Sequence, residues 1–481
     1  MISQKLSLKG FIHKHKILFF QFTCINGLDF FNNEYKILII KIRRTLIMRL
    51  LNKPLYMYLM LFSLTTIVGT LLLYLPVTGV KPLNFIDAFF ISASAFTVTG
   101  LATIDISNQF NWLGDTIILL LIQIGGLGIV TVTLLTLILM HRKISLRNRY
   151  LIMTTWNIET PGGVIKLILQ FVVYSIFTEF IGAICIALSF IPKYGLGKGI
   201  FLSVFTSISA FNNAGFSLFN DNMMRTVNDP IITMIVPLLI IMGGIGPLVF
   251  LDVATTRKLS KLTVHSKIVL TTSIILIFIG WIVFYFLESN HSMAHLSFLE
   301  KLGASFFQSV TTRTAGFNSV DIGLITPPTS VLLMLLMFIG GAPISAAGGI
   351  KVTTLVLTLL FIKSTLRNEQ HPSIFKKSIN DHTLKTAVAI TFSAGAFVII
   401  VSFIVSYLNS AISYTKVLFE VISAFGTVGL SMNFTTFYDS PTKIVIVLTM
   451  LIGKIGILTF LQLFITEKNQ KFHYAKENVH L

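Results

Sequence analysis

Four stretches of the sequence end in the same pattern, in which small or hydroxylated residues lead to a glycine and a large apolar residue. They read Ser94-Ala95-Phe96-Thr97-Val98-Thr99-Gly100-Leu101, Ser209-Ala210-Phe211-Asn212-Asn213-Ala214-Gly215-Phe216, Val310-Thr311-Thr312-Arg313-Thr314-Ala315-Gly316-Phe317 and Ser423-Ala424-Phe425-Gly426-Thr427-Val428-Gly429-Leu430. The aligned glycines lie 115, 101 and 113 residues apart. Because an internal repeat decides the architecture, the sequence predicts four copies of one structural unit.

Each stretch closes a short apolar segment that lies between longer apolar runs. Crossing a bilayer takes about 20 helical residues, and the short segments fall below this length, near 84–97, 200–211, 299–312 and 415–426. The longer runs lie near 55–76, 112–140, 167–191, 231–256, 268–288, 384–408 and 441–466, with an eighth, interrupted run near 329–365. The predicted fold class is an all-α integral membrane protein with four pseudo-symmetric helix–pore loop–helix repeats, hence eight spans and four re-entrant pore helices, around a central pore.

A second repeated motif, a pair of residues that begins with glycine, follows each stretch and helps to set the repeat boundaries. It reads Gly125-Gly126, Gly243-Gly244, Gly340-Gly341 and Gly453-Lys454. We expect repeat 1 over 53–140, repeat 2 over 166–256, repeat 3 over 266–365 with a broken second helix, repeat 4 over 384–466 and a cytoplasmic tail over 467–481. Residues 1–47 form an N-terminal extension outside this pattern, and we expect translation to start at Met48.

Composition and charge agree with a multi-pass membrane protein. Of the 481 residues, 54% are hydrophobic and 12% charged, against about 25% charged in soluble proteins. The net charge is +18, and 28 of the 37 Lys and Arg residues lie in the N-terminus, the loops 141–166, 257–267 and 363–385, the C-terminal tail and at Lys351. The positive-inside rule places these segments and both termini in the cytoplasm, so the charge does not indicate nucleic acid as a partner.

The loops after the short helices are the candidate ion-binding site. Irregular backbone at membrane depth has to line a cavity or lie buried in protein, and rings of carbonyls there can replace the hydration shell of an ion. Glycine permits the dihedral angles that this requires, and helix C-termini favour a cation. None of the loop residues is acidic, which suits a weakly hydrated monovalent cation. The predicted ion-binding residues are Thr97, Val98, Thr99, Gly100, Asn212, Asn213, Ala214, Gly215, Thr314, Ala315, Gly316, Thr427, Val428 and Gly429.

The alternative for any single glycine is close helix packing, for which membrane proteins use small residues. Four glycines in register after four half-length helices favour the pore instead.

The interrupted run contains a candidate gate. Its apolar halves are separated by Gly340-Gly341-Ala342-Pro343-Ile344-Ser345-Ala346-Ala347-Gly348-Gly349. Proline removes a backbone donor and glycine weakens a helix, so the segment predicts a flexible break near mid-membrane, with a passive kink as the alternative. Such a break below the loops suits a gate. The predicted gate residues are Gly340, Gly341, Ala342, Pro343, Ser345, Gly348, Gly349 and Lys454.

Lys454 stands where the other repeats have Gly126, Gly244 and Gly341. A lysine inside a span is costly and by default functional, so we predict that its charge projects into the path and impedes cations. Pairing with a carboxylate such as Glu179, or snorkelling to an interface, is the alternative. Arg313, beside the third loop, is expected to anchor that loop through Asp or carbonyl partners.

The sequence does not favour an enzyme. A polytopic membrane enzyme would need intramembrane His, paired acids or a nucleophile–base pair, and no His falls centrally in a predicted span. Walker A, nucleophile-elbow and dinucleotide motifs are missing, so we expect no organic cofactor. His291 and His295 are four residues apart, but two histidines make a weak metal signal and solvated side chains are the better interpretation.

Over about residues 50–466 the chain resembles the Trk/Ktr/HKT superfamily of cation transporters, most closely the KtrB-type membrane subunit of bacterial Ktr systems. The four loop sequences and the Gly340–Gly349 segment carry this resemblance. It implies potassium uptake, in some members sodium-dependent, through one pore in each subunit of a homodimer in the cell membrane. It also implies a cytosolic ring of nucleotide-binding regulatory subunits of the KtrA or KtrC kind, and makes the Gly340–Gly349 segment the counterpart of the family's gating loop.

Two details bear on the ion and on the gate. Gly100 is retained where some plant relatives carry Ser and prefer sodium, which favours potassium as the ion; a sodium-selective or poorly selective transporter of the same fold is the alternative. Family members usually carry Arg where this chain has Lys454. The positive charge is therefore kept, but the planar guanidinium group with its fixed set of hydrogen-bond donors is lost.

Overall fold

The computed structural model describes residues 54–128, 131, 164–256, 258–343 and 345–461. The chain divides into two compact units, Met1–Met57 and Tyr58–Leu481. Of the first unit, only the first turn of one helix is described. The predicted extension over 1–47 and tail over 467–481 lie outside the described residues.

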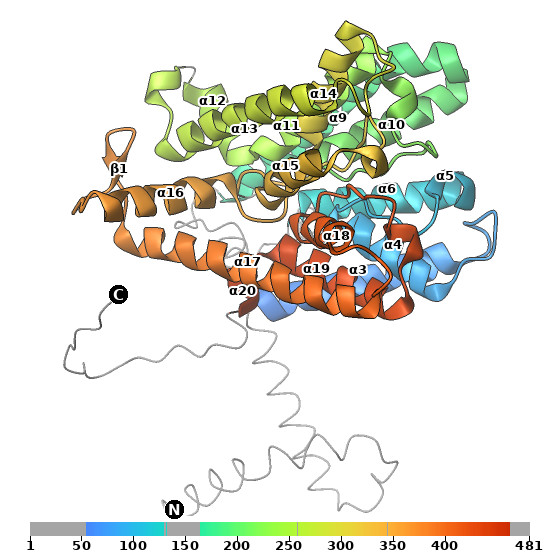
Figure 1. The fold of residues 1–481 in the computed structure, drawn as a ribbon. Helices are drawn as coiled ribbons and strands as arrows, with labels where there is room; N and C mark the ends of the chain where they lie inside the picture. Colours follow the sequence, from blue (N-terminus) through green and yellow to red (C-terminus); the bar gives the residue numbers. More distant parts are fainter. Residues whose placement is uncertain (1–53, 129–130, 132–163, 257, 344, 462–481) are drawn as a thin grey trace, which may run out of the picture. The chain divides into compact units, whose positions relative to one another are not determined.

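Three kinds of helix recur four times in the same order, as predicted (Figure 1). The first helix of each repeat is α3 (Pro54–Tyr74), α9 (Val164–Tyr194), α13 (Val264–Glu288) or α17 (Asp381–Leu408). A short helix follows, namely α4 (Phe85–Thr97), α10 (Leu196–Phe211), α14 (Phe298–Thr311) or α18 (Tyr414–Gly426). After a loop comes the second helix, α6 (Trp112–Leu127), α11 (Pro230–Ile245), α15 (Pro327–Phe338) or α19 (Ser440–Ile455).

Smaller elements connect these helices. They are α5 (Ile106–Gln109), α12 (Pro247–Thr256), α16 (Val352–Leu366), α20 (Ile457–Leu461) and the 3-10 turns η4 (Met224–Thr226), η5 (Leu259–Lys261), η6 (Ile322–Leu324) and η7 (Thr435–Phe437). One antiparallel hairpin, β1 (Ser373–Ile374) with β2 (Lys377–Ser378), joins α16 to α17 and pairs Ser373 with Ser378.

The second helices end earlier than the apolar pattern predicts. Glycines with positive φ follow α6, α11 and α19, namely Gly128 (φ 82°), Gly246 (φ 81°) and Gly456 (φ 93°). Glycine adopts such positive φ values at little cost and so ends a helix readily, and α12 leaves α11 at 93°. The prediction of a continuous span over 231–256 was therefore wrong, because Gly246 and Pro247 end α11, and Gly456 separates α19 from α20 within the predicted run over 441–466. The predicted break in repeat 3 is confirmed, between Phe338 and Val352.

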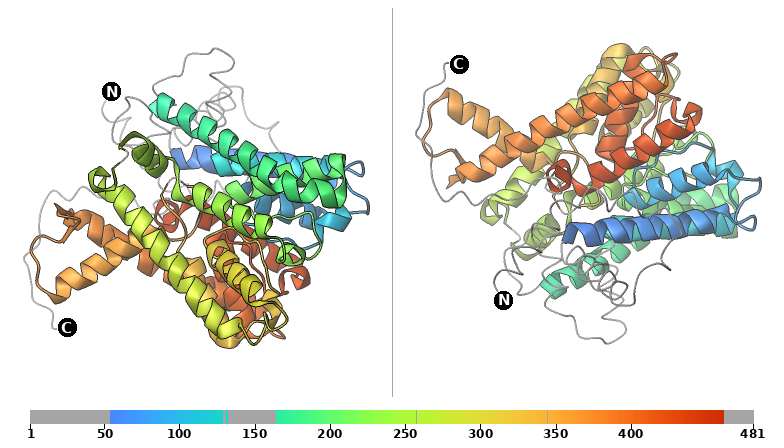
Figure 2. Two further views of the ribbon diagram at one scale, coloured as in Figure 1. Left: turned by 90° about the horizontal axis from the view of Figure 1, so that it is seen from above. Right: turned by 90° about the horizontal axis from the view of Figure 1, so that it is seen from below.

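The repeats pack on one another in a closed cycle. Each second helix contacts the short helix of the next repeat: α6 contacts α10, α11 contacts α14, α15 contacts α18, and α19 returns to α4 of the first repeat. The views in Figure 2 show the first and last repeats side by side although they lie at opposite ends of the chain. This cycle brings the four loops to one place.

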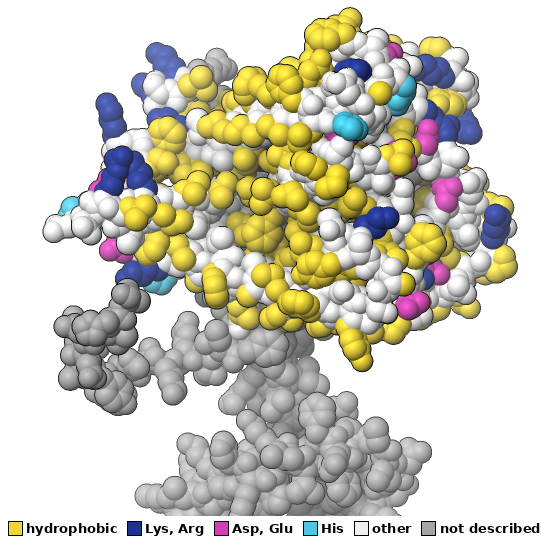
Figure 3. Space-filling view, viewed as in Figure 1, with side chains coloured by type: hydrophobic (Ala, Val, Ile, Leu, Met, Phe, Trp, Pro, Cys, Tyr) yellow, Lys and Arg dark blue, Asp and Glu magenta, His cyan; other side chains and the backbone are white. Residues whose placement is uncertain are grey.

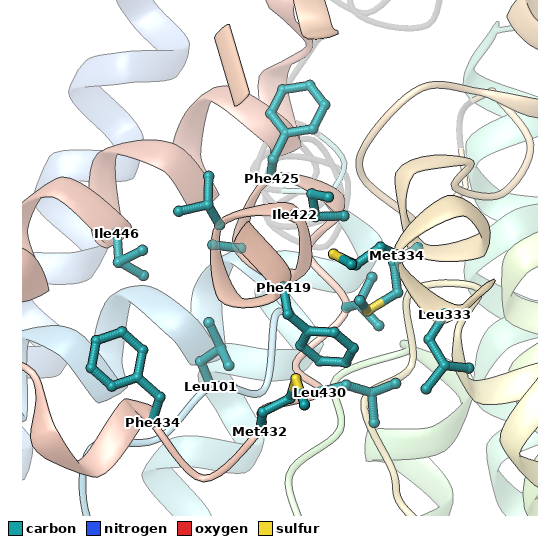
Figure 4. Packing of buried hydrophobic residues seen from close by; sticks show 14 of the residues in the cluster. Leu101, Leu333, Met334, Phe419, Ile422, Phe425, Leu430, Met432, Phe434 and Ile446 are labelled. Atoms are coloured by element: carbon teal, nitrogen blue, oxygen red, sulfur yellow. The ribbon is translucent and has the colours of Figure 1, made fainter. Parts of the chain in front are cut away.

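The largest hydrophobic core surrounds α18, which is buried on most sides (Figure 4). Phe419, Ile422 and Phe425 of α18 pack with Leu101 and Leu430, the residues that follow the glycines of loops 1 and 4. Apolar packing therefore holds both loops at the residue that follows each glycine.

The outer surface is apolar along the lengths of the helices (Figure 3). Large exposed side chains include Phe177 and Phe180 on α9, and Phe392 and Phe403 on α17. Among the described helices, α9, α13 and α17 are each long and apolar enough to cross a membrane, and α11 with α12 forms a fourth, bent candidate. The fold is that of an all-α multi-pass membrane protein built from repeats.

Candidate functional site

The four loops share one backbone conformation. The ring glycines, Gly100, Gly215, Gly316 and Gly429, have φ values of 90°, 68°, 74° and 93°. The residue two positions earlier also has positive φ in every loop: 59° at Val98, 56° at Asn213, 70° at Thr314 and 51° at Thr427. Alternation between left-handed and ordinary φ turns successive carbonyls toward the same side of the chain. Four non-glycine residues hold an uncommon conformation at equivalent positions, so the conformation belongs to the site.

The ring glycines meet one another in chain order. A Cβ atom built on Gly100 would lie 3.1 Å from Cα of Gly215, and one built on Gly215 would lie 2.9 Å from Cα of Gly316. The same construction on Gly316 reaches Cα of Gly429 at 3.1 Å, and on Gly429 reaches Cα of Gly100 at 3.1 Å. The four loops thus form a closed ring with no room for side chains at these positions.

Backbone and hydroxyl groups of the short helices hold each loop. The amide of Thr99 donates to the Ser94 carbonyl at 2.9 Å, and the amide of Gly100 donates to Ser94 Oγ at 3.2 Å. Ser423 does the same in repeat 4, with the amides of Val428 at 2.8 Å and Gly429 at 3.1 Å. In repeat 2, Ser209 Oγ instead donates to the Phe216 carbonyl at 2.8 Å.

The glycines that begin the second repeated motif are also explained by the structure. A side chain at Gly125, Gly243 or Gly453 would overlap the carbonyl oxygen at the end of the short helix, which belongs to Phe96, Phe211 or Phe425 respectively. The second helices therefore press directly against the ends of the short helices. Here the close-packing interpretation of glycine applies, while the ring glycines have positive φ as well.

The loops differ at the position three residues before each ring glycine. This position holds Thr97, Asn212, Arg313 and Gly426. Thr97 Oγ1 bonds within its own loop, 2.8 Å from Thr99 Oγ1. Arg313 is 8% exposed and its Nε has no hydrogen-bond partner. The Asp partner expected for Arg313 is not found among the residues described, and its guanidinium borders a small apolar crevice between α11 and α13.

The segment between α15 and α16 crosses to other repeats. The amide of Ala342 donates to the Gly244 carbonyl at 3.0 Å, and the amide of Gly349 donates to the Gly453 carbonyl at 3.3 Å. A side chain on Gly348 would collide with Thr427 of the fourth loop. The predicted gate therefore lies directly against one predicted ion-binding residue.

Two lysines hold this segment. Lys454 Nζ donates to the Ala346 carbonyl at 2.6 Å, and Lys351 Nζ donates to the neighbouring Ala347 carbonyl. Within the described parts of the chain, Lys454 forms no ion pair with Glu179 or any other carboxylate. Sequence reasoning counted Lys351 with the cytoplasmic charges and missed this contact, although its position directly after the glycines was a signal.

A second missed group lies behind loop 2. Gln123 on α6 and Glu179 on α9 both bond to the Asn212 side chain, with Nδ2 of Asn212 3.1 Å from Gln123 Oε1 and 3.0 Å from Glu179 Oε1. An acid inside a span was the available signal.

Metal-binding side chains do not gather elsewhere in the described part of the chain, where no group of three or more His, Cys, Asp or Glu residues lies together. His291 and His295 line an external cleft of about 660 Å³ that borders η4 and η6. The ring, with its backbone carbonyls and hydroxyls, is the arrangement suited to a cation.

Comparison with known proteins gives consistent results. The family model for TrkH, described as a cation transport protein, matches residues 54–475. The chain is 40% identical to the Ktr system potassium uptake protein B of Bacillus subtilis (strain 168) over 420 residues, covering 87% of this chain and 94% of that protein. It is 34% identical over 407 residues to the potassium/sodium uptake protein NtpJ of Enterococcus hirae, covering 83% and 90%. The crystal structure of the potassium transporter TrkH from Vibrio parahaemolyticus matches with a TM-score of 0.67 at 17% identity, covering 84% of each chain.

The fold is that of a multi-pass membrane protein, and the family and relatives it matches are cation transport proteins and not enzymes. The chain belongs to the TrkH family of cation transport proteins, and within it resembles the Ktr type.

Proposed function

We propose that this chain is the potassium-translocating subunit of a bacterial Ktr-type uptake system. The observation that carries the proposal is the closed ring of four glycine loops with matching positive φ values. Carbonyls from four sides of such a ring replace the water around a K⁺ ion. The relatives whose names include potassium uptake support the choice of ion.

The ring glycines and the residues before them form the selectivity filter of this proposal. Each loop contributes three or four residues, and the Thr hydroxyls and backbone carbonyls are neutral oxygen donors. Neutral donors hold a monovalent ion without binding it so tightly that it cannot leave. The C-terminal ends of four short helices add partial negative charge toward the ring.

In this proposal the Gly340–Gly349 segment is the gate, and hydrogen bonds from Lys454 and Lys351 hold it closed. Both ammonium groups bond to adjacent carbonyls of the segment, which reaches the ring at Thr427. Opening then requires these bonds to break, so the lysines favour the closed state.

Orientation and partners follow from charge and from the Ktr type. Lys and Arg side chains occur at both ends of the molecule in Figure 3, but most Asp and Glu side chains in this view lie at the end away from α12 and β1. We assign the end that carries α12 and β1, with both termini, to the cytoplasm. A homodimer in the cell membrane and a nucleotide-binding ring of the KtrA or KtrC kind complete the proposed system, in which Na⁺ dependence is a property to measure.

The test is growth and ⁸⁶Rb⁺ or K⁺ uptake on low potassium, in a cell that lacks its own uptake systems and expresses this chain with a regulatory partner. We expect rescue by K⁺ that depends on both proteins. A chain that is present in the membrane yet moves no K⁺ argues against the proposal. Uptake of Na⁺ as fast as K⁺ favours the poorly selective alternative, which the potassium/sodium uptake protein of Enterococcus hirae makes worth testing.

A further inference from the structure

A buried carboxylate lies behind one filter loop, and no Lys, Arg or His in the described part of the chain pairs with it. Glu179 is 7% exposed, near the middle of α9. Both of its carboxylate oxygens accept from Gln123 Nε2, at 3.1 and 3.2 Å. Its Oε1 also accepts from Asn212 Nδ2 at 3.0 Å. No ion pair of Glu179 occurs among the residues that the structure describes, so an acid at membrane depth is stabilised by two neutral amides.

When Glu179 is ionised, the donors and acceptors in this triangle have one possible direction. An ionised carboxylate only accepts hydrogen bonds, so the Gln123 amide has to turn its NH₂ toward Glu179. Gln123 Oε1 then faces Asn212 Nδ2, 3.1 Å away. The carboxylate thereby fixes the orientation of both amides.

Asn212 transmits this order to the ring. It is the C-cap of α10 and stands three residues before Gly215. It is followed by Asn213, whose side chain lies 3.3 Å from Thr314 Oγ1 of the next loop. The triangle also joins repeat 1, through α6, to repeat 2, through α9. The other loops hold Thr, Arg and Gly at this position, so loop 2 is supported differently from its three counterparts.

We propose that Glu179 is a positioning residue for ion selection, acting through Gln123 and Asn212 to hold loop 2 of the filter. This inference rests on the proposed function. It assigns the carboxylate to ion affinity and discrimination, whereas the gate and its lysines set how often the path opens.

The triangle allows an exchange experiment. In Glu179→Gln the direction of the bonds is no longer fixed, because a third amide can both donate and accept. Exchanging the two side chains, Gln123→Glu with Glu179→Gln, restores one acid that accepts from Asn212 and from one Gln amide. Gln123→Glu alone leaves two carboxylates competing for one amide. Ser175→Ala, one turn earlier on α9, is the matched control, because it removes a buried hydrogen bond to Phe171 that stays within the helix.

The readouts are KM and Vmax for K⁺ uptake, the K⁺/Na⁺ ratio and the amount of each variant in the membrane. Uptake by the unaltered chain tests the proposed function separately. We expect Glu179→Gln to raise KM about tenfold, equivalent to about 1.4 kcal/mol, and to lower the K⁺/Na⁺ ratio with less change in Vmax. The exchanged double variant should return within about twofold of the unaltered chain, as should Ser175→Ala.

Two results overturn the proposal. One is a Glu179→Gln variant with KM and ion ratio equal to those of Ser175→Ala. The other is a double variant no better than Glu179→Gln. If Glu179→Gln does not accumulate in the membrane, Gln123→Met decides the matter in its place. It keeps the carboxylate and removes one side of the triangle, so a raised KM supports the proposal and an unchanged KM contradicts it.

Discussion

At the scale of single residues, glycine serves two distinct purposes in this protein. Gly125, Gly243 and Gly453 lie in ordinary helix and let second helices touch carbonyls of the short helices. The ring glycines meet a neighbouring loop in a left-handed conformation. A substitution at a ring glycine therefore faces both a steric and a conformational penalty.

Gly316→Ser tests the ring directly. Its Cβ would collide with the Val428 carbonyl, and φ at this position is 74°. The left-handed conformation alone costs a residue with Cβ about 1–2 kcal/mol, so we expect loops 3 and 4 to separate and the K⁺/Na⁺ uptake ratio to fall about tenfold. The control is Gly395→Ser in α17, where a Cβ meets nothing within 4 Å. Equal ion ratios in the two variants would remove Gly316 from the filter.

Lys454→Ala tests whether the Lys454 hydrogen bond holds the gate closed. Removing Nζ frees the Ala346 carbonyl, which it now holds at 2.6 Å. A hydrogen bond to a charged group contributes about 1.5–3 kcal/mol, so we expect uptake without the regulatory partner to rise about tenfold. Lys454→Arg keeps a charged donor, so its uptake without the partner should rise less. Lys198 is exposed, and Lys198→Ala should leave this uptake unchanged. Lower uptake by Lys454→Ala than by the unaltered chain, at equal abundance in the membrane, would contradict the proposal that Lys454 holds the gate closed.

At the scale of helices and loops, the ends of the elements determine the site. Polar residues start the second helices, as where Asp229 accepts from the amides of Ile231 at 3.0 Å and Ile232 at 3.4 Å. Asp229 also binds Lys193 Nζ at 2.6 Å and the Ser189 hydroxyl. Burial raises the pKa of this carboxyl, but Lys193 and Ser189 lower it more, so the pKa lies below its usual value.

Asp229→Asn should therefore destabilise the protein in a pH-dependent way. A lowered folded-state pKa means that the stabilisation is present above the ordinary carboxyl pKa of about 3.9 and is lost as pH falls further. Asn keeps the cap but removes the charge that faces Lys193 and the start of α11, so at pH 7 we expect a loss of about 1 kcal/mol, with a gap between the variant and the unaltered chain that narrows below about pH 4. Thermal unfolding in detergent measures it. Asp439→Asn is the control, because Asp439 precedes α19 without a side-chain cap bond; equal losses in both variants would deny Asp229 its special role.

The helices and loops could be predicted from the sequence more readily than the contacts between them. Segment lengths and the repeated motif predicted the short helices, the loops and the break between α15 and α16, because these signals are local. The breaks at Gly128 and Gly456 were missed, since a single glycine barely alters an apolar run, whereas the Gly246-Pro247 pair was a signal that went unused. The contacts of Glu179 and Lys351 were missed for another reason. Their partners, Asn212 and the Ala347 carbonyl, become neighbours only when helices pack, and hydropathy carries no information on such contacts.

At the scale of the whole molecule, the ring has to close between the two ends of the chain. Repeats 1 to 4 are connected in order by covalent links, but repeat 4 meets repeat 1 through non-covalent contacts, among them those of α19 with α4. Lys443 Nζ lies 2.6 Å from Asp87 Oδ1 at this junction, with side chains 15% and 7% exposed. Thr103 Oγ1 donates to the same carboxylate oxygen at 2.6 Å, so loop 1 depends on this junction.

A double-mutant cycle on Asp87 and Lys443 tests whether this pair closes the ring. Removing one partner of a buried pair leaves an uncompensated charge and costs about 3–5 kcal/mol, so Lys443→Met and Asp87→Asn should each lower the thermal midpoint in detergent and the K⁺/Na⁺ uptake ratio. Replacing both removes the stranded charge, and we expect the double variant to be less destabilised than the sum of the single variants by about 1–3 kcal/mol. Lys193→Met, whose side chain is 51% exposed in its pair with Asp229, controls for the loss of a lysine and should leave the ion ratio unchanged. Additive effects at Asp87 and Lys443 would mean that apolar packing of α19 on α4 closes the ring unaided.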